Sequence, residues 1–340
     1  MAWPTSERGM RLMAWTMIAT LVVAFVVVRG CIAYAHRRGM LDQPGQRRSH
    51  TVPTARGGGL GLVVAWVLAM LLVLPGSLPW PLLAALLAGT LGVAAIGWLD
   101  DHGDLPVRPR LLVQLAACAV FAAAVCSHGL AWWWWPLLVL AGTWSINLHN
   151  FIDGIDGLLA QQCIFVGVGI ACIAAGIGSP VLLAASGAFS MAALGFWWFN
   201  RSPARIFMGD VGSGAVGFII FALTTLVWLV DAPALWAALL LSSSVATDAT
   251  LTLLSRMRGG RRWYSAHREH LYQWLVRRGH GHARVGGYYL AWNLCVVAPL
   301  AAAAMAWPGL APLCCVLGYG LAAVAWVGGK RAILRSVAHG

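Results

Sequence analysis

Long apolar runs follow one another along almost the whole chain, and they constrain its fold more than any other feature. A helix of about 20 apolar residues is long enough to cross the hydrocarbon core of a bilayer. Backbone groups in that environment must be hydrogen-bonded within the protein, which favours helices. The sequence therefore predicts an all-α, polytopic integral membrane bundle with about 11 transmembrane helices. The predicted spans are residues 12–35, 60–75, 80–99, 111–127, 131–147, 158–177, 180–199, 214–230, 233–254, 286–306 and 309–328.

The composition agrees with a membrane protein and gives no sign of separate domains. Only 10% of the residues are charged, whereas soluble domains carry about 25% charged residues. No linker or low-complexity segment divides the sequence, so we expect residues 1–340 to form a single membrane domain. The first apolar run is too long for the hydrophobic region of a signal peptide and is interpreted as a retained transmembrane helix.

The loops between the predicted spans alternate between short, nearly uncharged loops and long, basic ones. Every lysine and arginine except Arg8 and Arg11 falls on the side of the long loops. Loops rich in Lys and Arg stay in the cytoplasm, which predicts an N-terminus outside and a cytoplasmic C-terminus. The long cytoplasmic loops are residues 36–59, 100–110, 148–157, 200–213 and 255–285.

The acidic residues gather at the same face of the membrane. All Asp and Glu residues except Glu7 and Asp231 lie at the cytoplasmic ends of the predicted spans, and the middle of each span is free of charge. Transporters usually carry ionisable groups near the middle of the bilayer. The pattern therefore favours an enzyme working at the membrane surface, with its active site formed by the five cytoplasmic loops.

Paired acids stand out in two stretches. Asp100 and Asp101 end the third predicted span, where acidic side chains oppose the helix dipole, and adjacent carboxylates suit a Mg²⁺ ligand beside a general base. Residues 147–160 read NLHNFIDGIDGLLA. If this stretch is helical, Asn150, Asp153 and Asp156 lie along one i, i+3 stripe. A metal ion or an arginine would relieve the repulsion between its two acids.

A glycine-rich turn joins an acid to the start of a predicted helix in residues 205–218, RIFMGDVGSGAVGF. Gly209 and its neighbours would let backbone N–H groups approach an anion at the helix N-terminus. Asp210 stands where a phosphate-bound Mg²⁺ needs a ligand. With Phe207 beside them, these residues predict a phosphate-binding segment.

The first and the last of the long basic loops supply candidates for anion binding, which are Arg56 in the first and His267, Arg268 and His270 in the last. The histidines lack the further ligands of a zinc site, so an anion site is favoured, with an amphipathic interfacial helix as the alternative. Asp248 lies inside the ninth predicted span, where an unpaired acid is costly, and is expected to have a partner. No function is assigned to His280 and His282.

Carboxylates, glycine-rich turns and a surplus of Arg and His thus converge on one face of the bundle. This combination indicates metal-dependent phosphate chemistry, and the position at the bilayer suggests that one substrate is a lipid. Two rivals are a lipid-linked-sugar transporter or flippase, which the uncharged span centres disfavour, and a CDP-alcohol phosphotransferase. The second rival needs further aspartates on the helix that follows Asp156, and the next acid is Asp210.

These segments, in this order, resemble the polyprenyl-phosphate N-acetylhexosamine-1-phosphate transferase family (glycosyltransferase 4). The family includes the enzymes that initiate O-antigen and enterobacterial common antigen and, more distantly, phospho-N-acetylmuramoyl-pentapeptide transferase. The resemblance covers roughly residues 36–285. The matching stretches are D-x-P-x-x-R-x-x-H-x-x-P-T-x-R-G-G-G from Asp42, the Asp100–Asp101 pair, N-x-x-N-F-x-D-G-x-D-G-L from Asn147 and F-M-G-D-x-G-S from Phe207.

The resemblance implies transfer of N-acetylhexosamine-1-phosphate from a UDP-sugar to undecaprenyl phosphate, which yields undecaprenyl-diphospho-sugar and UMP. It places the protein in the bacterial inner membrane, with the active site on the cytoplasmic face, where it would initiate O-antigen or another cell-surface polysaccharide. Mg²⁺ is the implied metal, with Mn²⁺ as an alternative. The expected partners are undecaprenyl phosphate, UDP-N-acetylhexosamine and membrane lipids, without nucleic acid. The oligomeric state is left open between a monomer and a homodimer.

The resemblance also implies roles for individual residues. Asp100 would deprotonate or position the lipid phosphate, Asp101 would assist it, and Asp210 would bind the metal, with Asp101 as a second ligand. The expected substrate-binding residues are Asn150, Asp153, Asp156, Phe207 (stacked on uracil), Gly209, Arg56, His267, Arg268 and His270. Whether the reaction is a single or a double displacement is left open.

The chain departs from the family's usual pattern at two places. Ala55 replaces the second proline of a P-T-P-R motif, a change we expect to be harmless. The histidine region of the family often carries an H-x-H-H run, and here the later histidines are replaced by Tyr272 and Gln273. This second departure leaves open which N-acetyl sugar is used and which of His267 and His270 contacts it.

Overall fold

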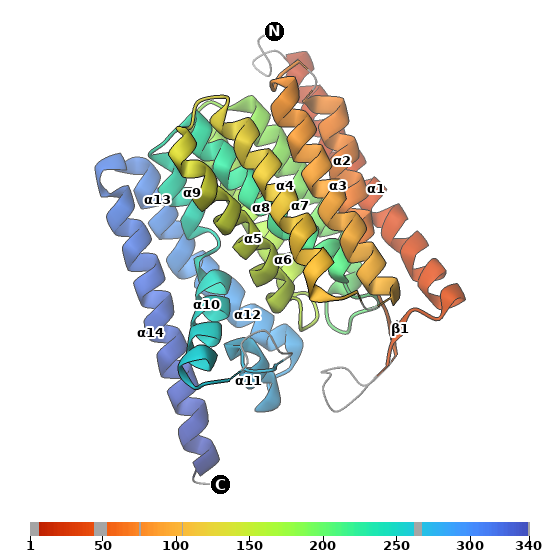
Figure 1. Cartoon of the computed structure of the whole chain (residues 1–340), viewed down its shortest axis with the longest axis vertical. Coiled ribbons are helices and arrows are strands. Elements are labelled where there is room, and N and C mark those ends of the chain that lie inside the picture. The colour runs from red at the N-terminus through yellow and green to blue at the C-terminus, as the bar shows by residue number, and fades with distance from the viewer. Residues whose placement is uncertain (1–6, 44–52, 75, 104, 262–266, 339–340) are drawn as a thin grey trace.

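The computed structural model describes residues 7–43, 53–74, 76–103, 105–261 and 267–338. These residues form a bundle of helices with one two-stranded sheet at one end (Figure 1). The sheet pairs β1 (Leu41–Asp42) with β2 (Thr54–Ala55). The α-helices are α1 (Glu7–Arg38), α2 (Gly59–Val73), α3 (Trp80–Gly103), α4 (Val107–Cys126), α5 (Trp135–Ile152), α6 (Leu158–Gly176), α7 (Pro180–Asn200), α8 (Asp210–Val230), α9 (Ala234–Leu240), α10 (Ser243–Arg258), α11 (Leu271–Arg277), α12 (His282–Trp292), α13 (Ala298–Ala306) and α14 (Ala311–Ala338).

Three short helical turns complete the set of elements. The 3₁₀ turns are η1 (Trp132–Trp134) and η3 (Pro308–Leu310), and η2 (Asn293–Val297) is a π-helical turn that joins α12 to α13. Because η2 continues the helix on both sides, residues 282–306 form one apolar stretch of 25 residues that is long enough to cross a membrane.

The prediction of a polytopic helical membrane protein is confirmed. Among the described residues, eight helices are long and apolar enough to cross a membrane, and the bent pair of α9 and α10 would make a ninth. The predicted spans 60–75 and 131–147 coincide with α2 and α5, which have 15 and 18 residues. The count of eleven and the orientation of the termini stay predictions.

One predicted span, 233–254, is wrong as a single helix, because α9 and α10 meet at an angle of 64°. The break leaves the carbonyl group of Leu241 without a helical partner, and the Gln162 side chain donates to it at 2.9 Å. Asn293 in turn donates to Gln162 (2.8 Å) and accepts from Ser244 (2.9 Å). Side chains from α6 and η2 thus bind the Leu241 carbonyl and the Ser244 hydroxyl at the break, as an apolar environment favours.

Helix α8 lies at the centre of the bundle, with nearly all of its residues buried. Glycines allow its neighbours to approach closely. A Cβ at Gly97 in α3 would overlap the Asp210 carbonyl group, and a Cβ at Gly217 in α8 would lie 2.7 Å from Ile146 Cα in α5. The N-terminus of α8 therefore lies beside the C-terminal ends of α3 and α5.

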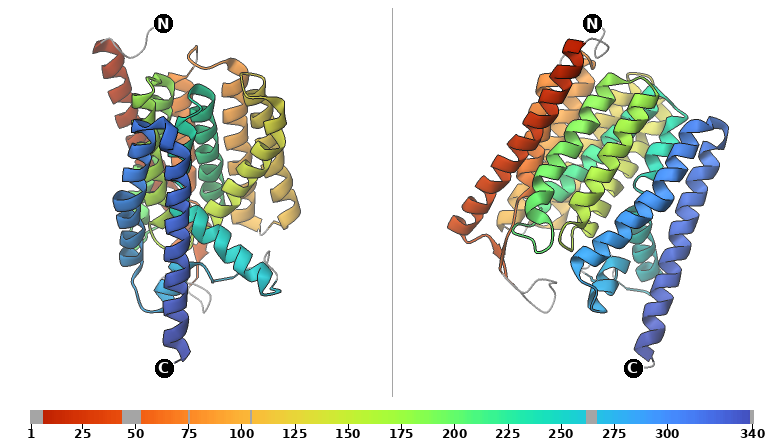
Figure 2. Two further views of the ribbon diagram at one scale, coloured as in Figure 1. Left: turned by 90° about the vertical axis from the view of Figure 1, so that its left-hand side faces the viewer. Right: turned by 180° about the vertical axis from the view of Figure 1, so that it is seen from behind.

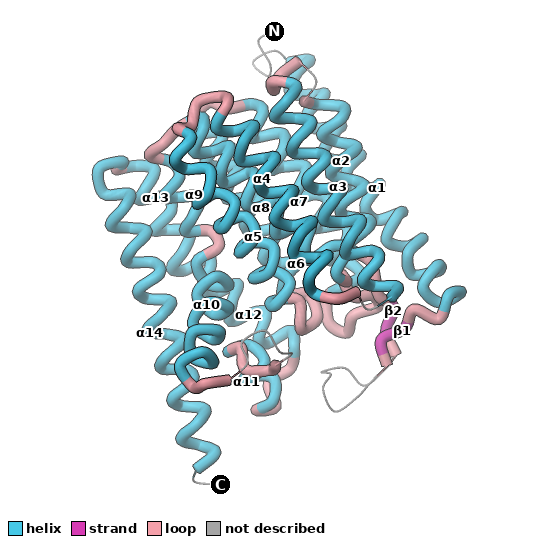
Figure 3. The backbone as a smooth tube through the Cα atoms, in the orientation of Figure 1, coloured by secondary structure: helices cyan, strands magenta, loops and turns pink. Residues whose placement is uncertain are grey.

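The small sheet attaches the loop before α2 to the loop before α8. Strands β1 and β2 lie at the same end of the bundle as the loop before α8 (Figure 3). Leu41 pairs with Ala55, and Ala55 also forms a parallel bridge with Ile206. The next residue, Arg56, is thereby placed next to the start of α8.

A second, smaller hydrophobic core forms where the C-terminal elements meet α5 and α6. Its buried members are Leu148, Ile152, Ile155, Leu158, Val245, Ala249, Tyr272, Val285 and Tyr289. Helix α14 passes along this region and extends beyond the other helices (Figure 2). The acid-containing turn between α5 and α6 is therefore packed against α10, α11 and α12.

Candidate active site

Asp101, in the last turn of α3, holds the start of α8. Its carboxylate accepts hydrogen bonds from the backbone N–H groups of Asp210 (2.9 Å) and Val211 (3.0 Å) and forms an ion pair with Arg56 Nε (2.8 Å). The first N–H groups of a helix have no partner within that helix, and a carboxylate there complements the helix dipole. The Asp101 side chain is fully buried and both of its oxygens are engaged. The structure thus gives Asp101 an anchoring role, while its catalytic and metal-binding roles stay predictions.

Gly209 precedes α8 with a φ of 75°, a conformation that residues with a side chain rarely adopt. A Cβ at this position would lie 2.5 Å from Asp101 Oδ2 and 3.0 Å from the backbone nitrogen of Gly57. Glycine is needed here because Asp101 fills the space into which a side chain would project. The anion at this helix N-terminus is therefore the protein's own carboxylate.

Asp210, the first residue of α8, lies where several elements meet. Its Oδ1 accepts from Asn150 Nδ2 (2.7 Å), and its Oδ2 lies 3.4 Å from Arg56 Nη2 and 3.3 Å from Arg110 Nη1. Asn150 also donates to Ser213 Oγ (3.0 Å). The Asp210 side chain remains 22% exposed. The fold thus joins Asn150 and Asp210, predicted from separate motifs, in one site that is open to solvent.

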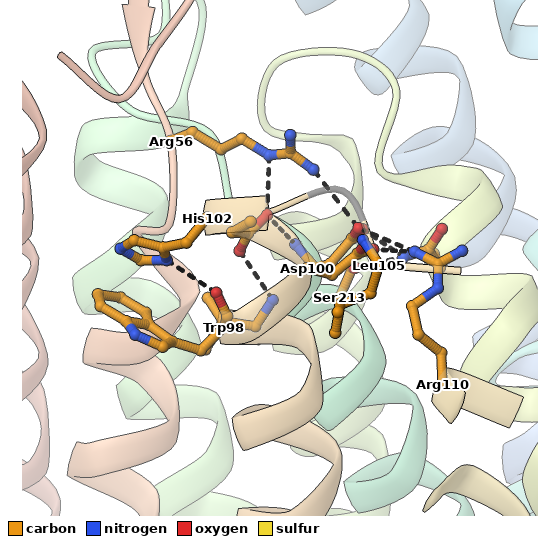
Figure 4. A network of polar contacts seen from close by, with 11 residues as sticks. Arg56, Trp98, Asp100, His102, Leu105, Arg110 and Ser213 are labelled. Atoms are coloured by element: carbon orange, nitrogen blue, oxygen red, sulfur yellow. Dashed lines mark hydrogen bonds and ion pairs between the residues drawn. The ribbon is translucent and has the colours of Figure 1, made fainter. Parts of the chain in front are cut away.

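Asp100 forms an ion pair with Arg110 in the first turn of α4 (Figure 4). The same Arg110 nitrogen reaches Asp210. The other Asp100 oxygen accepts from the backbone N–H of Leu105 (2.7 Å). Arg110 therefore bridges two of the predicted site carboxylates. Arg110 is not among the site residues predicted from the sequence. The sequence feature that could have indicated Arg110 is its position ten residues after Asp100, at the start of the next helix.

The predicted helical stripe through Asn150, Asp153 and Asp156 is wrong. Helix α5 ends at Ile152, and residues 153–157 form turns. Each acid is followed by a glycine, and Gly157, with a φ of 76°, directly precedes the start of α6 at Leu158. The two acids consequently point to different surroundings.

Asp153 faces the cluster around α8. Burial raises the pKa of Asp153 well above its ordinary range, the charges of Asp210 and Asp101 raise it further, and Arg56 acts in the opposite direction. Carboxylates that crowd together in this way favour a shared proton or a cation. Asp153 therefore belongs with Asp101 and Asp210 electrostatically, although it comes from another loop.

Asp156 contacts His282, at the start of α12, and the loop between α7 and α8. Its Oδ1 lies 3.1 Å from His282 Nδ1, and its Oδ2 accepts from the backbone N–H of Ala204 (3.2 Å). Burial raises the pKa of Asp156, but the bonds and charge of His282 and the bonds from Ala204 and Ser202 outweigh it, so the net pKa is lowered. His282, to which the sequence analysis assigned no function, is thus the partner of a predicted site residue.

The predicted anion-binding histidines lie against Phe151, the last but one residue of α5. The ring centroids of His267 and His270 lie 6.3 and 5.9 Å from that of Phe151 and 5.0 Å from each other. His270 is only 2% exposed, whereas His267 and Arg268 are half-buried. Of the two histidines, His267 is thus the better placed to contact a substrate.

Stability should fall on acidification because of His270. Burial lowers the pKa of His270 to about 4, with Asp248 acting against this and His267 and Arg256 adding to it. The neutral form is favoured in the folded state, so stability is full above the unfolded pKa of about 6.5 and is lost between about 6.5 and 4, by roughly 3 kcal/mol. Unfolding midpoints in detergent at pH 7 and pH 5 measure the part of this loss that falls above pH 5, about 2 kcal/mol. A His270→Gln variant should show a smaller loss, and an equal loss would contradict the assignment.

Asp248 has several partners, as expected. Its oxygens accept from the Leu271 N–H (2.8 Å), the Tyr289 hydroxyl (2.7 Å) and the Trp326 indole (3.1 Å), and His270 Nδ1 lies 3.9 Å away. It caps α11 and connects this helix to α12 and α14. The contacts of Asp248 are internal to the C-terminal elements.

Phe207, the predicted uracil-stacking residue, is half-buried. Its backbone N–H donates to the Ala55 carbonyl (2.8 Å), and its carbonyl accepts from Gly58 (2.9 Å). A polar pocket of about 460 Å³ opens beside Arg56, with Asp42 and Asp101 in its wall. The site thus has space for a polar group next to Arg56, and stacking by Phe207 stays a prediction.

The charges of the cluster suit a hard cation. Four carboxylates (Asp100, Asp101, Asp153 and Asp210) face two guanidinium groups, Arg56 and Arg110. Among the described residues, no group of three or more His, Cys, Asp or Glu side chains could hold a metal by itself. Mg²⁺, however, commonly binds through one or two carboxylates and takes its other ligands from substrate phosphates and water. Oxygen donors with an excess of negative charge fit that pattern.

The chain is similar to proteins that act on polyprenyl phosphates. Residues 83–228 match the family model described as glycosyl transferase family 4. A probable undecaprenyl-phosphate N-acetylglucosaminyl 1-phosphate transferase of Bacillus subtilis is 30% identical over 235 residues, covering 65% of this chain and 64% of the relative. Decaprenyl-phosphate N-acetylglucosaminephosphotransferase of Mycobacterium tuberculosis is 30% identical over 324 residues, covering 81% and 78%.

A third relative carries the name of a different sugar-phosphate transferase. Phospho-N-acetylmuramoyl-pentapeptide-transferase of Heliobacterium modesticaldum is 29% identical over 247 residues, which cover 64% of this chain and 75% of the relative. The chain belongs to glycosyl transferase family 4.

Proposed function

We propose that this protein transfers an N-acetylhexosamine-1-phosphate group from a UDP-sugar to undecaprenyl phosphate, with undecaprenyl-diphospho-sugar and UMP as products. The observation that carries the proposal is the cluster in which Arg56 and Arg110 face Asp100, Asp101 and Asp210 at one end of a membrane bundle. Such a site presents both cationic and anionic groups to a diphosphate. The names of the relatives, which specify polyprenyl phosphates and amino-sugar phosphates, support the same reaction class.

The proposed chemistry is an in-line attack by an oxygen of the lipid phosphate on the sugar-linked phosphorus of the UDP-sugar, with UMP as the leaving group. Asp100, held by Arg110 and by the Leu105 N–H, would position the lipid phosphate and accept its proton. Arg56 and Arg110 would stabilise the negative charge that spreads over the phosphoryl oxygens. Asn150 would keep Asp210 in its orientation through their 2.7 Å hydrogen bond.

The proposed metal is Mg²⁺, with Mn²⁺ as an alternative. Asp210, which is partly exposed, and Asp153, which is drawn toward a cation by its like-charged neighbours, would hold it. Mg²⁺ at these carboxylates would neutralise charge on the diphosphate. Asp101 is the less suitable ligand because its oxygens already bind the start of α8 and Arg56.

The proposed location is the cytoplasmic face of a bacterial inner membrane. The basic loops at the site end of the bundle would attract anionic lipid headgroups and anionic substrates. A protein of this kind would initiate a cell-surface polysaccharide, such as an O-antigen or a cell-wall polymer.

UMP release by purified protein tests the proposal. The protein in detergent would be incubated with undecaprenyl phosphate, Mg²⁺ and a panel of UDP-N-acetylhexosamines, with and without EDTA. Metal-dependent release that requires the lipid is expected, and the active sugar identifies the donor. Release without the lipid would indicate a hydrolase. Movement of lipid-linked sugar across vesicles without UMP release would favour the transporter alternative.

A further inference from the structure

Tyr272 connects the C-terminal part of the chain to the turn that carries Asp153. It is fully buried in the second hydrophobic core, and its hydroxyl donates to the Phe151 carbonyl at 2.8 Å. Gln273 Nε2 donates to the same hydroxyl at 3.1 Å. Since that hydroxyl both donates and accepts, its orientation is fixed.

The end of α5 needs such a partner. The last carbonyl groups of a helix have no hydrogen-bond donor within the helix, and Phe151 is the residue before the end of α5 at Ile152. The Tyr272 hydroxyl supplies that donor at the point where the chain leaves the helix. One residue before Phe151 lies Asn150, which binds Asp210, and two residues after it lies Asp153.

Gly154 gives a second, independent indication that Tyr272 is closely fitted to this turn. A Cβ on Gly154 would overlap the Tyr272 hydroxyl and lie 3.0 Å from Cζ of the same ring. The φ of Gly154 is not in the left-handed region. Glycine is therefore required at this position by the tyrosine rather than by its backbone conformation.

Tyr272 is itself held from the other side. Its backbone N–H and that of Leu271 point to the carboxylate of Asp248, at 3.5 and 2.8 Å. Asp248 also accepts from Tyr289 in α12 and Trp326 in α14. Helices α12 and α14 thus fix the ring through Asp248, and the ring fixes the end of α5.

We infer that Tyr272 is a positioning residue for the proposed transferase reaction, since its hydroxyl sets the end of α5 and thereby the placement of Asn150 and Asp153 relative to Asp210. The inference rests on the proposed function. Tyr272 does not touch the reacting groups in this arrangement and acts through the α5–α6 turn.

Tyr272→Phe removes one hydroxyl and keeps the ring. Misplacement of an active-site group lowers the rate of the chemical step more than it weakens substrate binding. We expect kcat for UMP release to fall about tenfold, with KM for the UDP-sugar changed by less than about twofold. The matched control is Tyr319→Phe, which removes a comparable bond from Tyr319 to the Leu239 carbonyl (3.1 Å) outside the site. Wild-type kcat in Tyr272→Phe, or an equal loss in the control, would overturn the inference.

Two measurements decide the inference without any assay of activity. Hydrogen–deuterium exchange of residues 150–158 should accelerate in Tyr272→Phe and remain unchanged in Tyr319→Phe. Gly154→Ala should lower the unfolding midpoint more in the wild type than in Tyr272→Phe, because the phenylalanine lacks the overlapping oxygen. If the wild type releases no UMP, the proposed function is wrong, but the positioning of the α5–α6 turn by Tyr272 is still decided by these two measurements. Unchanged exchange in this segment, or an equal effect of Gly154→Ala in both backgrounds, overturns the role of Tyr272.

Discussion

Asp210→Asn should reduce the turnover number for UMP release by at least about 10²-fold in protein that remains folded. The substitution keeps the size of the side chain and an oxygen for Asn150, but it removes the charge that Arg56 and Arg110 share. The cluster then loses one of the two carboxylates proposed for Mg²⁺. Initial rates at saturating substrates, over a range of Mg²⁺ concentrations, measure the effect.

The matched control for this variant is Asp231→Asn. Asp231 also stands at a helix start, where its Oδ1 accepts from Ala234 (2.9 Å), but it lies outside the site. Its rate should stay within about twofold of the wild type because it faces none of the cluster charges. A rate for Asp210→Asn as high as that of the control would remove Asp210 from the proposed machinery.

Asp101→Ala should destabilise the protein by about 3 kcal/mol, in addition to its effect on activity. The substitution leaves Arg56 without its nearest carboxylate and the first N–H groups of α8 without acceptors, in the most buried helix of the bundle. Chemical unfolding in detergent, followed by the circular dichroism of the helices, measures the loss.

Asp231→Ala serves as the reference for a simple helix cap. Its loss should be about 1 kcal/mol, which is typical of a cap without a buried ion pair. If the two variants lose the same stability, the carboxylate of Asp101 contributes no more than an ordinary cap, and the anchoring role derived from its contacts is wrong.

The sequence predicted the membrane bundle well because the length of an apolar run is a local property. The prediction of a single span over residues 233–254 failed at the break between α9 and α10. Residues 242–244 are serines, and a continuous membrane helix also tolerates serine. The partners that stabilise the break are Gln162 and Asn293, which come from α6 and the π-helical turn η2. Which side chains form hydrogen bonds with the residues at this break depends on how distant helices pack together. No local sequence pattern contains that information.

In the candidate site, too, the sequence predicted what depends on local motifs and missed what depends on the packing of distant segments. Acids and glycines in short motifs identified Asp100, Asp101, Asp153 and Asp210, and the fold brings these residues together. Arg110 and His282 were missed because they lie outside the motifs and meet their carboxylate partners only in the folded chain. The helical stripe failed because α5 ends at Ile152, so that Asn150 lies in the helix whereas Asp153 and Asp156 lie in the turn that leads to α6.

The central position of α8 has a consequence for biosynthesis. Helices α3 and α5 leave the ribosome before α8, and both pack closely against it, α3 through its Gly97 and α5 against Gly217 of α8. Until residues 210–230 enter the membrane, Asp101 lacks the N–H groups that it caps and Asn150 lacks its carboxylate partner. Nascent chains that end before α8 therefore carry these polar groups without their native bonds.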